Sequence, residues 1–371
     1  WRWVFFVNLP IGLLAFAIVG IGMPWTRPVH GARPRLDLLG AALLALTLVP
    51  LLLALTWGGH QYAWDSPPIL AMLGAAAVGV PLFILVESRA AEPILPPSLF
   101  RNRTFSVSAV VLFALGAGLF GGITMVPTFL QGVKGIAASG SGTLMTPMSI
   151  TLSASAGVGG QVMTRTGRYK VLSLVGVGLV VVGLALFSLL RVDSPMLAVE
   201  AVMVLIGFGG GITFPVFTVV VQNALPFQLI GVATASATFF RQIGATVGVA
   251  LLTGLMIGRF REGVASVAGN YPAITQNTDS LLNERSVAVV RRAYEATATQ
   301  GQPAFDVLLA QTRIELASAI ALVFVVAAVL VGIGWVTLLA IPELPLNSVS
   351  PAELARRHRE ASAPLEAQHA P

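Results

Sequence analysis

The sequence contains no cysteine, which excludes disulfides, thiolate metal sites and thiol nucleophiles. Charged residues are also scarce, because they make up only 10% of the 371 positions, whereas a soluble domain has about 25%. No Gly-Lys-Ser or Gly-Lys-Thr follows the glycine-rich stretches, so the phosphate loop of an ATP-driven pump is missing. The four histidines show no metal-ligand spacing, and we expect no metal and no bound cofactor; they are His30, His60, His358 and His369.

Hydrophobic residues make up 56% of the chain. This share is well above that of soluble domains and indicates an integral membrane protein, which has the lipid bilayer as a partner. The net charge of +6 comes from 22 basic residues spread between long apolar runs. They form no continuous stripe, and we therefore expect no nucleic-acid partner.

Nine stretches are apolar and long enough to cross a membrane, for which a helix needs about 20 residues. The sequence therefore predicts an all-α fold, a polytopic membrane helix bundle. A polar segment of about 259–313, with a short helix near 280–299, separates the last two spans, and a polar tail at 342–371 is expected to be disordered. The predicted spans are approximately residues 4–23, 38–57, 68–86, 106–130, 141–163, 171–190, 196–222, 229–258 and 314–341.

Basic residues in the short loops indicate the orientation of the chain. One set of alternate loops and the tail contain twelve basic residues, whereas the opposite short loops contain only Lys134 and Arg191, with Arg2 at the start. The first end of the chain is therefore expected outside the cell and the second in the cytoplasm, with the spans in the plasma (inner) membrane. The twelve are Arg27, Arg33, Arg35, Arg89, Arg101, Arg103, Arg165, Arg168, Lys170, Arg356, Arg357 and Arg359.

Two stretches carry the motifs of a known family. In "WRWVFFVNLPIG" the matching positions are Trp1, Arg2, Trp3, Phe5, Asn8, Pro10 and Gly12. In "VPTFLQGVKGIAASGSGTLMTP" they are Pro127, Gln131, Val133, Gly135, Gly142 and Pro147. With these motifs the chain resembles the fourteen-span drug:proton antiporter branch of the major facilitator superfamily, of the EmrB/QacA type.

The resemblance implies an organisation of the chain. Residues 1–30 would be the last span of an N-terminal bundle, 31–104 an extra central helix pair with its linker, and 105–341 a complete six-helix C-terminal bundle. The chain would then be an N-terminally truncated fragment that starts at the sixth span, and the missing N-terminal half of the same transporter would be its partner.

The resemblance also implies a function. Family members are secondary transporters and not enzymes, so we expect proton-coupled efflux of a small-molecule substrate by alternating access. The substrates would be hydrophobic or cationic drugs or small metabolites, and the proton gradient would supply the energy. A non-transporting membrane scaffold or an inactive transporter fragment is the alternative.

The stretch "GGQVMTRTGRYK" resembles the cytoplasmic loop motif of the superfamily, at Gly160, Arg165, Gly167, Arg168 and Lys170. Glycine permits a tight turn with a positive φ, and basic side chains can bind the carbonyls at helix C-termini. Thr164 occupies the acidic position of the motif, which removes an ion-pair partner. A gating role and plain positive-inside anchoring therefore both stay open.

The stretch "ATFFRQIGATVGVALL" matches a further family pattern, at Arg241, Gln242, Gly244 and Gly248. From Ile243 to Gly258 there are only 16 residues, about 24 Å of helix, which is too short to cross a membrane. Arg241 is therefore predicted to lie just inside the membrane's edge, where an arginine usually faces a cavity or a partner. It could bind an anionic group or hold two transporter halves in register, or its side chain could extend to the cytoplasmic interface.

Further candidates for the substrate cavity are Pro127 and Pro147, which flank Gln131. Prolines inside a span free carbonyl groups, and a watery cavity can satisfy them. Met125 and Phe129 would add adaptable apolar surface to such a cavity, or would equally face lipid. With Arg241 and Gln242 these are the predicted substrate residues.

Glu200 is the acidic residue expected near the outer end of the span 196–222. Its carboxylate could take up a proton from outside. Alternatively, it serves as a first-turn acid that interacts with the helix dipole.

Overall fold

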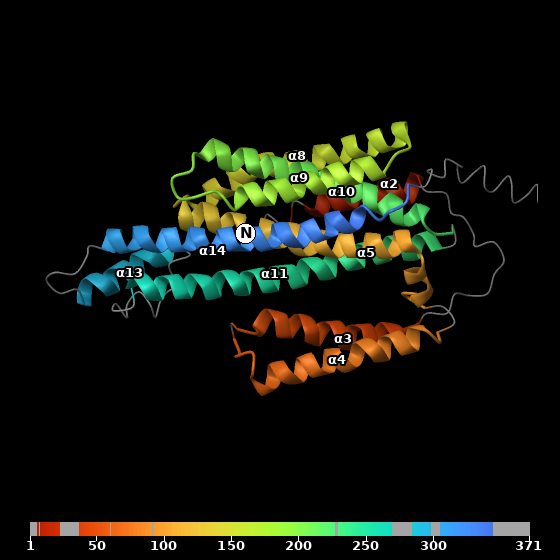
Figure 1. Ribbon diagram of the computed structural model, residues 1–371, viewed down its shortest axis with the longest axis horizontal. Helices are drawn as coiled ribbons and strands as arrows, with labels where there is room; N and C mark the ends of the chain where they lie inside the picture. Colours follow the sequence, from red (N-terminus) through yellow and green to blue (C-terminus); the bar gives the residue numbers. More distant parts are fainter. Residues whose placement is uncertain are drawn as a thin grey trace, which may run out of the picture. The chain divides into compact units, whose positions relative to one another are not determined.

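The computed structural model describes residues 6, 8–22, 37–59, 61–90, 93–226, 229–268, 284–297 and 305–343, most of them in helices (Figure 1). These described residues form no strand, and a single isolated bridge joins Gly58 and Tyr62. The chain divides into two units, Trp1–Asp37 and Leu38–Pro371, and each is described by itself. The predicted all-α fold class is confirmed.

The first unit contains the helix α2 (Asn8–Gly22), which has 15 apolar residues, none of them buried. It covers most of the predicted span 4–23. Several positions on which the sequence analysis relied lie outside the described residues, namely Trp1, Arg2, Trp3, Phe5, Arg27, Arg33 and Arg35.

Seven helices among the described residues are long and apolar enough to cross a membrane. They are α3 (Leu38–Trp57), α4 (Pro67–Glu87), the interrupted helix Arg103–Val133, α9 (Lys170–Phe187), α10 (Met196–Asn223), α11 (Ile230–Ala268) and α14 (Phe305–Leu338). A further helix, α8 (Ala138–Thr166), has 29 residues but is rich in serine and threonine and is not one of the seven. Each of the nine predicted spans thus coincides with a helix, although two of the nine miss the criteria of length or apolar composition.

The helices α3 and α4 run side by side as an antiparallel pair (Figure 1). α4 begins directly after Ser66 with Pro67 in its first turn. Proline is tolerated there because backbone N–H groups in the first turn have no hydrogen-bond partner within the helix. Thr47 of α3 is buried against Gly79 of α4, and the absence of a side chain on Gly79 allows the two helices to approach closely. A short helix, η1 (Pro97–Arg101), follows the pair and leads into the main bundle.

The segment 103–133 is one helical path broken into five pieces. Asn102 caps its start, because the side-chain oxygen accepts hydrogen bonds from the N–H groups of Thr104 and Phe105, and its amide donates to the carbonyl of Ala224. Two pieces are π-helical, a geometry often found at functional sites. The pieces are α5 (Arg103–Leu115), η2 (Gly116–Phe120), α6 (Gly121–Ile123), α7 (Val126–Thr128) and η3 (Phe129–Val133).

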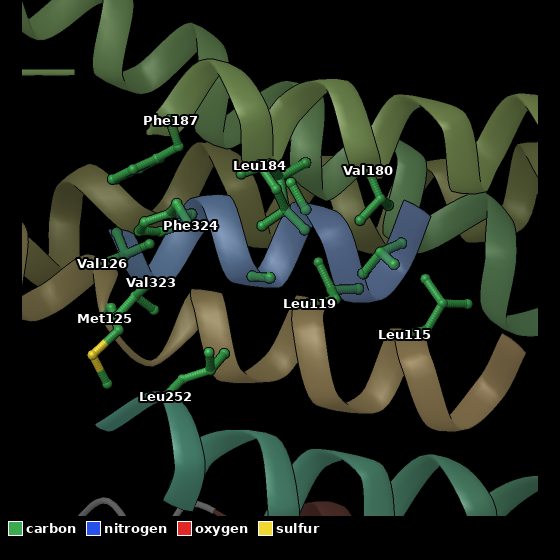
Figure 2. Packing of buried hydrophobic residues seen from close by; sticks show 14 of the residues in the cluster. Leu115, Leu119, Met125, Val126, Val180, Leu184, Phe187, Leu252, Val323 and Phe324 are labelled. Carbon is green, nitrogen blue, oxygen red and sulfur yellow. The ribbon is translucent and has the colours of Figure 1, made fainter. Parts of the chain in front are cut away.

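The core of the bundle lies between the broken helix and helices α9, α10, α11 and α14. Figure 2 shows Leu184 and Phe187 of α9 near Phe324 of α14. The rings of Phe187 and Phe324 are stacked, with centroids 3.9 Å apart and planes 18° apart. Leu115 and Leu119 of the broken helix are fully buried in the same core, which therefore fixes the π-helical segment between the longer helices.

Helices extend into both ends of the predicted polar segment, about 259–313. α11 continues to Ala268 and α14 already begins at Phe305, because charged residues such as Arg259 and Arg261 end an apolar run without ending a helix. The predicted short helix is confirmed as α13 (Glu284–Thr297). Residues 269–283 and 298–304, and the tail from 344 on, lie outside the described residues.

Candidate functional site

Arg241 lies in an aromatic cluster made by three elements of the bundle. Its guanidinium carbon is 5.1 Å from the ring centroid of Phe214 in α10. That ring in turn stacks on Phe120 at the end of η2, with centroids 5.7 Å apart and planes 23° apart. We call Phe120, Phe214 and Arg241 the arginine cluster. A cation over an aromatic face is worth about 0.5–2 kcal/mol, more when water is excluded.

Glycines place α11 directly against the broken helix. A Cβ atom on Gly244 would overlap the carbonyl of Phe113, and one on Gly248 would overlap the carbonyl of Ala117. On the other side, a Cβ atom on Gly116 would overlap the carbonyl of Arg241 itself. Two glycines four residues apart form one face of a helix, so this part of the family pattern serves close helix packing. The π-helical turn and Arg241 are held together by this contact.

Arg241 lies within α11 and not at the end of that helix. It follows Ile230, the first residue of α11, by eleven residues, or about 17 Å of helix. Its aromatic partner Phe214 lies nine residues before the end of α10 at Asn223, about 14 Å from that end. The arginine cluster therefore joins interior turns of both helices. That Arg241 lies just inside the membrane's edge stays a prediction.

A cavity of about 410 Å³ adjoins the arginine cluster. Gln242 of α11 lines this cavity, and Phe120 belongs both to the cavity wall and to the arginine cluster. Four threonines give the otherwise apolar wall a polar component, so the cavity offers apolar surface together with several hydrogen-bonding groups. The lining residues are Leu55, Thr56, Phe120, Thr124, Gln242, Ala245, Thr246, Val249, Ala250 and Thr253.

The other predicted substrate residues do not gather at this cavity. Gln131 in η3 donates from Nε2 to the hydroxyl of Ser141 at 3.0 Å and so ties η3 to α8. Met125 and Phe129 are buried, at 4% and 1% exposure, in the hydrophobic core. Neither of them lines the cavity beside the arginine cluster. Figure 2 shows Met125 at the edge of that core.

The prolines flanking Gln131 also occupy different surroundings. Pro127 stands in the one-turn helix α7 and is half-buried, whereas Pro147 is exposed in the middle of α8.

The exposed face of α8 is a feature that the sequence analysis missed. Hydroxyl side chains follow one another on this face at spacings of three and four residues, and each donates to the carbonyl four residues before it. The spacing of serine and threonine in the sequence would have revealed the face. Its members are Thr143, Thr146, Ser149 and Ser153.

The loop motif joins α8 to α9 and is tied to the end of α14. Gly167 ends α8 with a φ of 66°, the left-handed conformation that favours glycine. The hydroxyl of the buried Tyr169 donates to the carbonyl of Pro342 at 2.7 Å, and the Lys170 ammonium donates to the carbonyl of Leu339 at 3.3 Å. The lysine thus sits at the negative end of the α14 dipole.

The remaining members of the motif have no such contacts. Arg165 and Arg168 are exposed and form no side-chain hydrogen bond or ion pair with the described residues. Gly160 lies half-buried in α8, with open space where a Cβ would stand. Tyr169 was not among the residues predicted from the sequence, although its hydroxyl forms the shorter of the two bonds that tie this loop to the end of α14.

Glu200 is half-buried in α10, four residues after Met196 and therefore just beyond the first turn. No group of three potential metal-ligating side chains is found among the described residues.

Comparisons with known proteins agree with the motifs. The sequence profile of the Major Facilitator Superfamily matches residues 1–249. The chain is 39% identical over 262 residues to the multidrug transporter protein MdtP of Bacillus subtilis (strain 168), an alignment that covers 70% of this chain and 47% of the relative. It is 36% identical over 222 residues to a tetracycline resistance determinant of Streptomyces rimosus, covering 60% and 64%.

A third relative matches over a longer stretch. An uncharacterized MFS-type transporter of Mycobacterium tuberculosis is 32% identical over 355 residues, which cover 94% of this chain and 48% of the relative. The chain thus spans about half the length of the Bacillus and Mycobacterium relatives that it matches.

Proposed function

This chain belongs to the Major Facilitator Superfamily, and we propose that it works in a secondary transporter that exports hydrophobic or cationic drugs or small metabolites. The observation that carries the proposal is the arginine cluster beside the cavity that Gln242 lines. An arginine inside a helix that is long and apolar enough to span a membrane is costly, and such residues mark substrate and ion pathways.

The composition of the cavity wall suits a substrate that is largely apolar. Apolar surface from Leu55, Phe120 and Val249 would contact the body of the substrate, while Gln242 and the threonines would orient its polar groups. Relatives that are named multidrug transporter and tetracycline resistance determinant favour drugs as the substrate class. Export would then need no cofactor beyond the proton gradient.

The transport cycle that we propose is alternating access, in which two helix bundles move about a site at their interface. The second unit described above supplies a bundle with α3 and α4 beside it. The exposed hydroxyl face of α8 fits a surface that meets water or polar groups, because lipid would favour apolar side chains there. A second bundle, from the N-terminal half of the same transporter, stays a prediction.

Proton coupling in the proposed cycle would involve groups at both ends of the bundle. Glu200 could take up a proton at the outer end of α10, and the loop motif at Gly167 could act at the opposite end. The proposed location is the inner membrane of the cell, with the basic loop on the cytoplasmic side.

Everted membrane vesicles test this function directly. They would be prepared from cells that express the whole protein carrying this chain and from matched cells that do not, and a panel of fluorescent apolar cations and tetracycline would be added under an imposed proton gradient. We expect accumulation inside the expressing vesicles that an ionophore abolishes. Equal accumulation in both vesicle types, with the protein confirmed in the membrane, would refute the proposal.

A further inference from the structure

A second and larger cavity, of about 700 Å³, lies at the end of the bundle opposite the loop motif. It is formed by the turn that follows α9 and by the first half of α14, and it shares no residue with the arginine cluster or its cavity. Its volume is in the range of ligand sites, about 300–1,000 Å³. The lining residues are Ser188, Leu190, Arg191, Val192, Asp193, Ala310, Arg313, Ile314, Ala317, Ser318 and Ala321.

The charged side chains of this cavity come from two separate elements. Arg191 and Asp193 belong to the turn, and Arg313 belongs to α14. None of the three forms an ion pair with another described residue. The lining side chains carry two positive charges and one negative charge, and the Lys134 ammonium beside Asp193 adds to the positive potential, so the cavity favours an anionic ligand. Arginine binds phosphate oxygens through two parallel hydrogen bonds.

The turn that carries Arg191 is held rigidly. The Lys134 ammonium donates to the carbonyl of Val192 at 2.8 Å and to that of Ser194 at 2.5 Å. The backbone N–H of Arg191 donates to the Ser194 hydroxyl at 2.9 Å. Burial lowers the pKa of Lys134, while Asp193 acts in the opposite direction. Lys134 therefore supports the turn from inside and leaves the ligand position to the arginines.

Arg313 is also confined by its surroundings. A Cβ atom on Gly135 would stand 3.0 Å from its Nη2 atom, so the guanidinium lies directly over this glycine. Gly135 has a φ of 67° and ends the broken helix with a left-handed turn. Two arginines on fixed elements lose less entropy on binding than free surface side chains would.

Apart from Ser188 and Ser318, the rest of the cavity lining is apolar, and the cavity lies where the apolar helices begin. The long apolar run of α14 starts after Glu315, two residues beyond Arg313, and α9 ends at Phe187, just before the turn. Arginines at such positions lie at the height of lipid headgroups. Below them, Ala317 and Ala321 line the cavity with small side chains, which leave room for a hydrocarbon chain.

We propose that this cavity binds an anionic phosphodiester lipid of the outer leaflet. Its phosphate lies between Arg191 and Arg313, and its acyl chain follows α14 along Ala317 and Ala321. Asp193 disfavours a doubly charged phosphate and accepts a hydroxyl group of the lipid head. The site is independent of the proposed transport function, because it requires neither the arginine cluster nor a second bundle.

Lipid binding to the purified protein in detergent tests the proposal, with native mass spectrometry as the readout. Phosphatidylglycerol, phosphatidylcholine with the same acyl chains, and glycerophosphoglycerol, which is the singly charged phosphodiester head of phosphatidylglycerol without acyl chains, would be titrated separately. We expect phosphatidylglycerol to bind about tenfold more tightly than phosphatidylcholine, because only the former has a net charge of −1. Equal binding of the two lipids would refute the role of charge, and equally tight binding of glycerophosphoglycerol would identify a free anion instead of a lipid.

Variants locate the binding in this cavity. The double variant Arg191→Gln/Arg313→Gln should weaken phosphatidylglycerol binding about tenfold. The control Arg259→Gln/Arg292→Gln removes the same charge from exposed positions on α11 and α13 and should bind as the wild type does. Ser318→Trp fills the cavity from an exposed position without changing charge and should also weaken binding. Unchanged binding in both cavity variants would overturn the proposal.

Discussion

The Arg241 guanidinium lies over the Phe214 ring at 5.1 Å, so the charge of this half-buried arginine is met by an aromatic face, and no carboxylate among the described residues forms an ion pair with it. An aromatic face attracts a cation much less strongly than a buried carboxylate would. The arginine therefore keeps most of its capacity to interact with an anionic group or with a moving partner, while its position is fixed. This combination is what a transport pathway requires and what a purely structural ion pair would not provide.

The contact between α11 and the broken helix leads to a first prediction about stability. Gly248→Val would place methyl groups on the carbonyl of Ala117, and we expect the free energy of unfolding to fall by about 1–3 kcal/mol or more. Gly254→Val is the matched control, because the same substitution on the same helix meets open space. Thermal unfolding of both variants in detergent would measure the difference. Similar melting temperatures for the two would contradict the packing described here.

A second prediction concerns the attachment of the loop motif to α14. Tyr169→Phe removes the hydroxyl that donates to Pro342 and should lower stability by about 0.5–1.5 kcal/mol, since the ring itself stays buried. Tyr62→Phe removes a hydroxyl from a side chain that is 40% exposed and should have no measurable effect. The two melting temperatures report the result. A Tyr169→Phe protein as stable as the wild type would mean that the bond contributes nothing.

A third experiment uses single cysteines to test the orientation of the chain in the membrane. Because the sequence contains no native cysteine, only the introduced residue can react with a thiol reagent. Cysteines at Gln61 and Ala137 should react with an impermeant thiol reagent applied to intact cells, and a cysteine at Arg168 should react only after the cells are opened. All three positions are exposed, and Arg168 avoids the positive φ of Gly167. The reverse labelling pattern would invert the proposed topology.

The comparison with the sequence shows which features apolar runs can predict. The predicted span 38–57 coincides with α3, and 68–86 differs from α4 by one residue at each end, because polar or turn-forming residues bound both runs. The end of α11 could not be found in this way. Arg259 and Glu262 stop the apolar run, yet they are good helix formers, and the helix continues to Ala268.

Some parts of the candidate site could likewise be predicted from the sequence, and others could not. The four-residue spacing of Gly244 and Gly248 predicts a close helix contact from sequence alone. The partners of Arg241 could not be predicted, since Phe120 and Phe214 are far away in the chain and meet it only after three elements have packed. The burial of Met125 and Phe129 in the core could not be predicted for a related reason, because an apolar side chain in a span gives no sign of whether it faces the core.

The transport rate of Arg241→Gln tests the central claim most directly. In the whole protein that carries this chain, this variant should reach the membrane in normal amounts and export the best substrate about tenfold more slowly, corresponding to about 1.4 kcal/mol. Arg241→Lys should recover only part of the rate, because a lysine lacks the planar guanidinium that stacks on Phe214. Arg259→Gln, the same change at an exposed position of α11, should transport as the wild type does. Wild-type rates in both Arg241 variants would contradict the account.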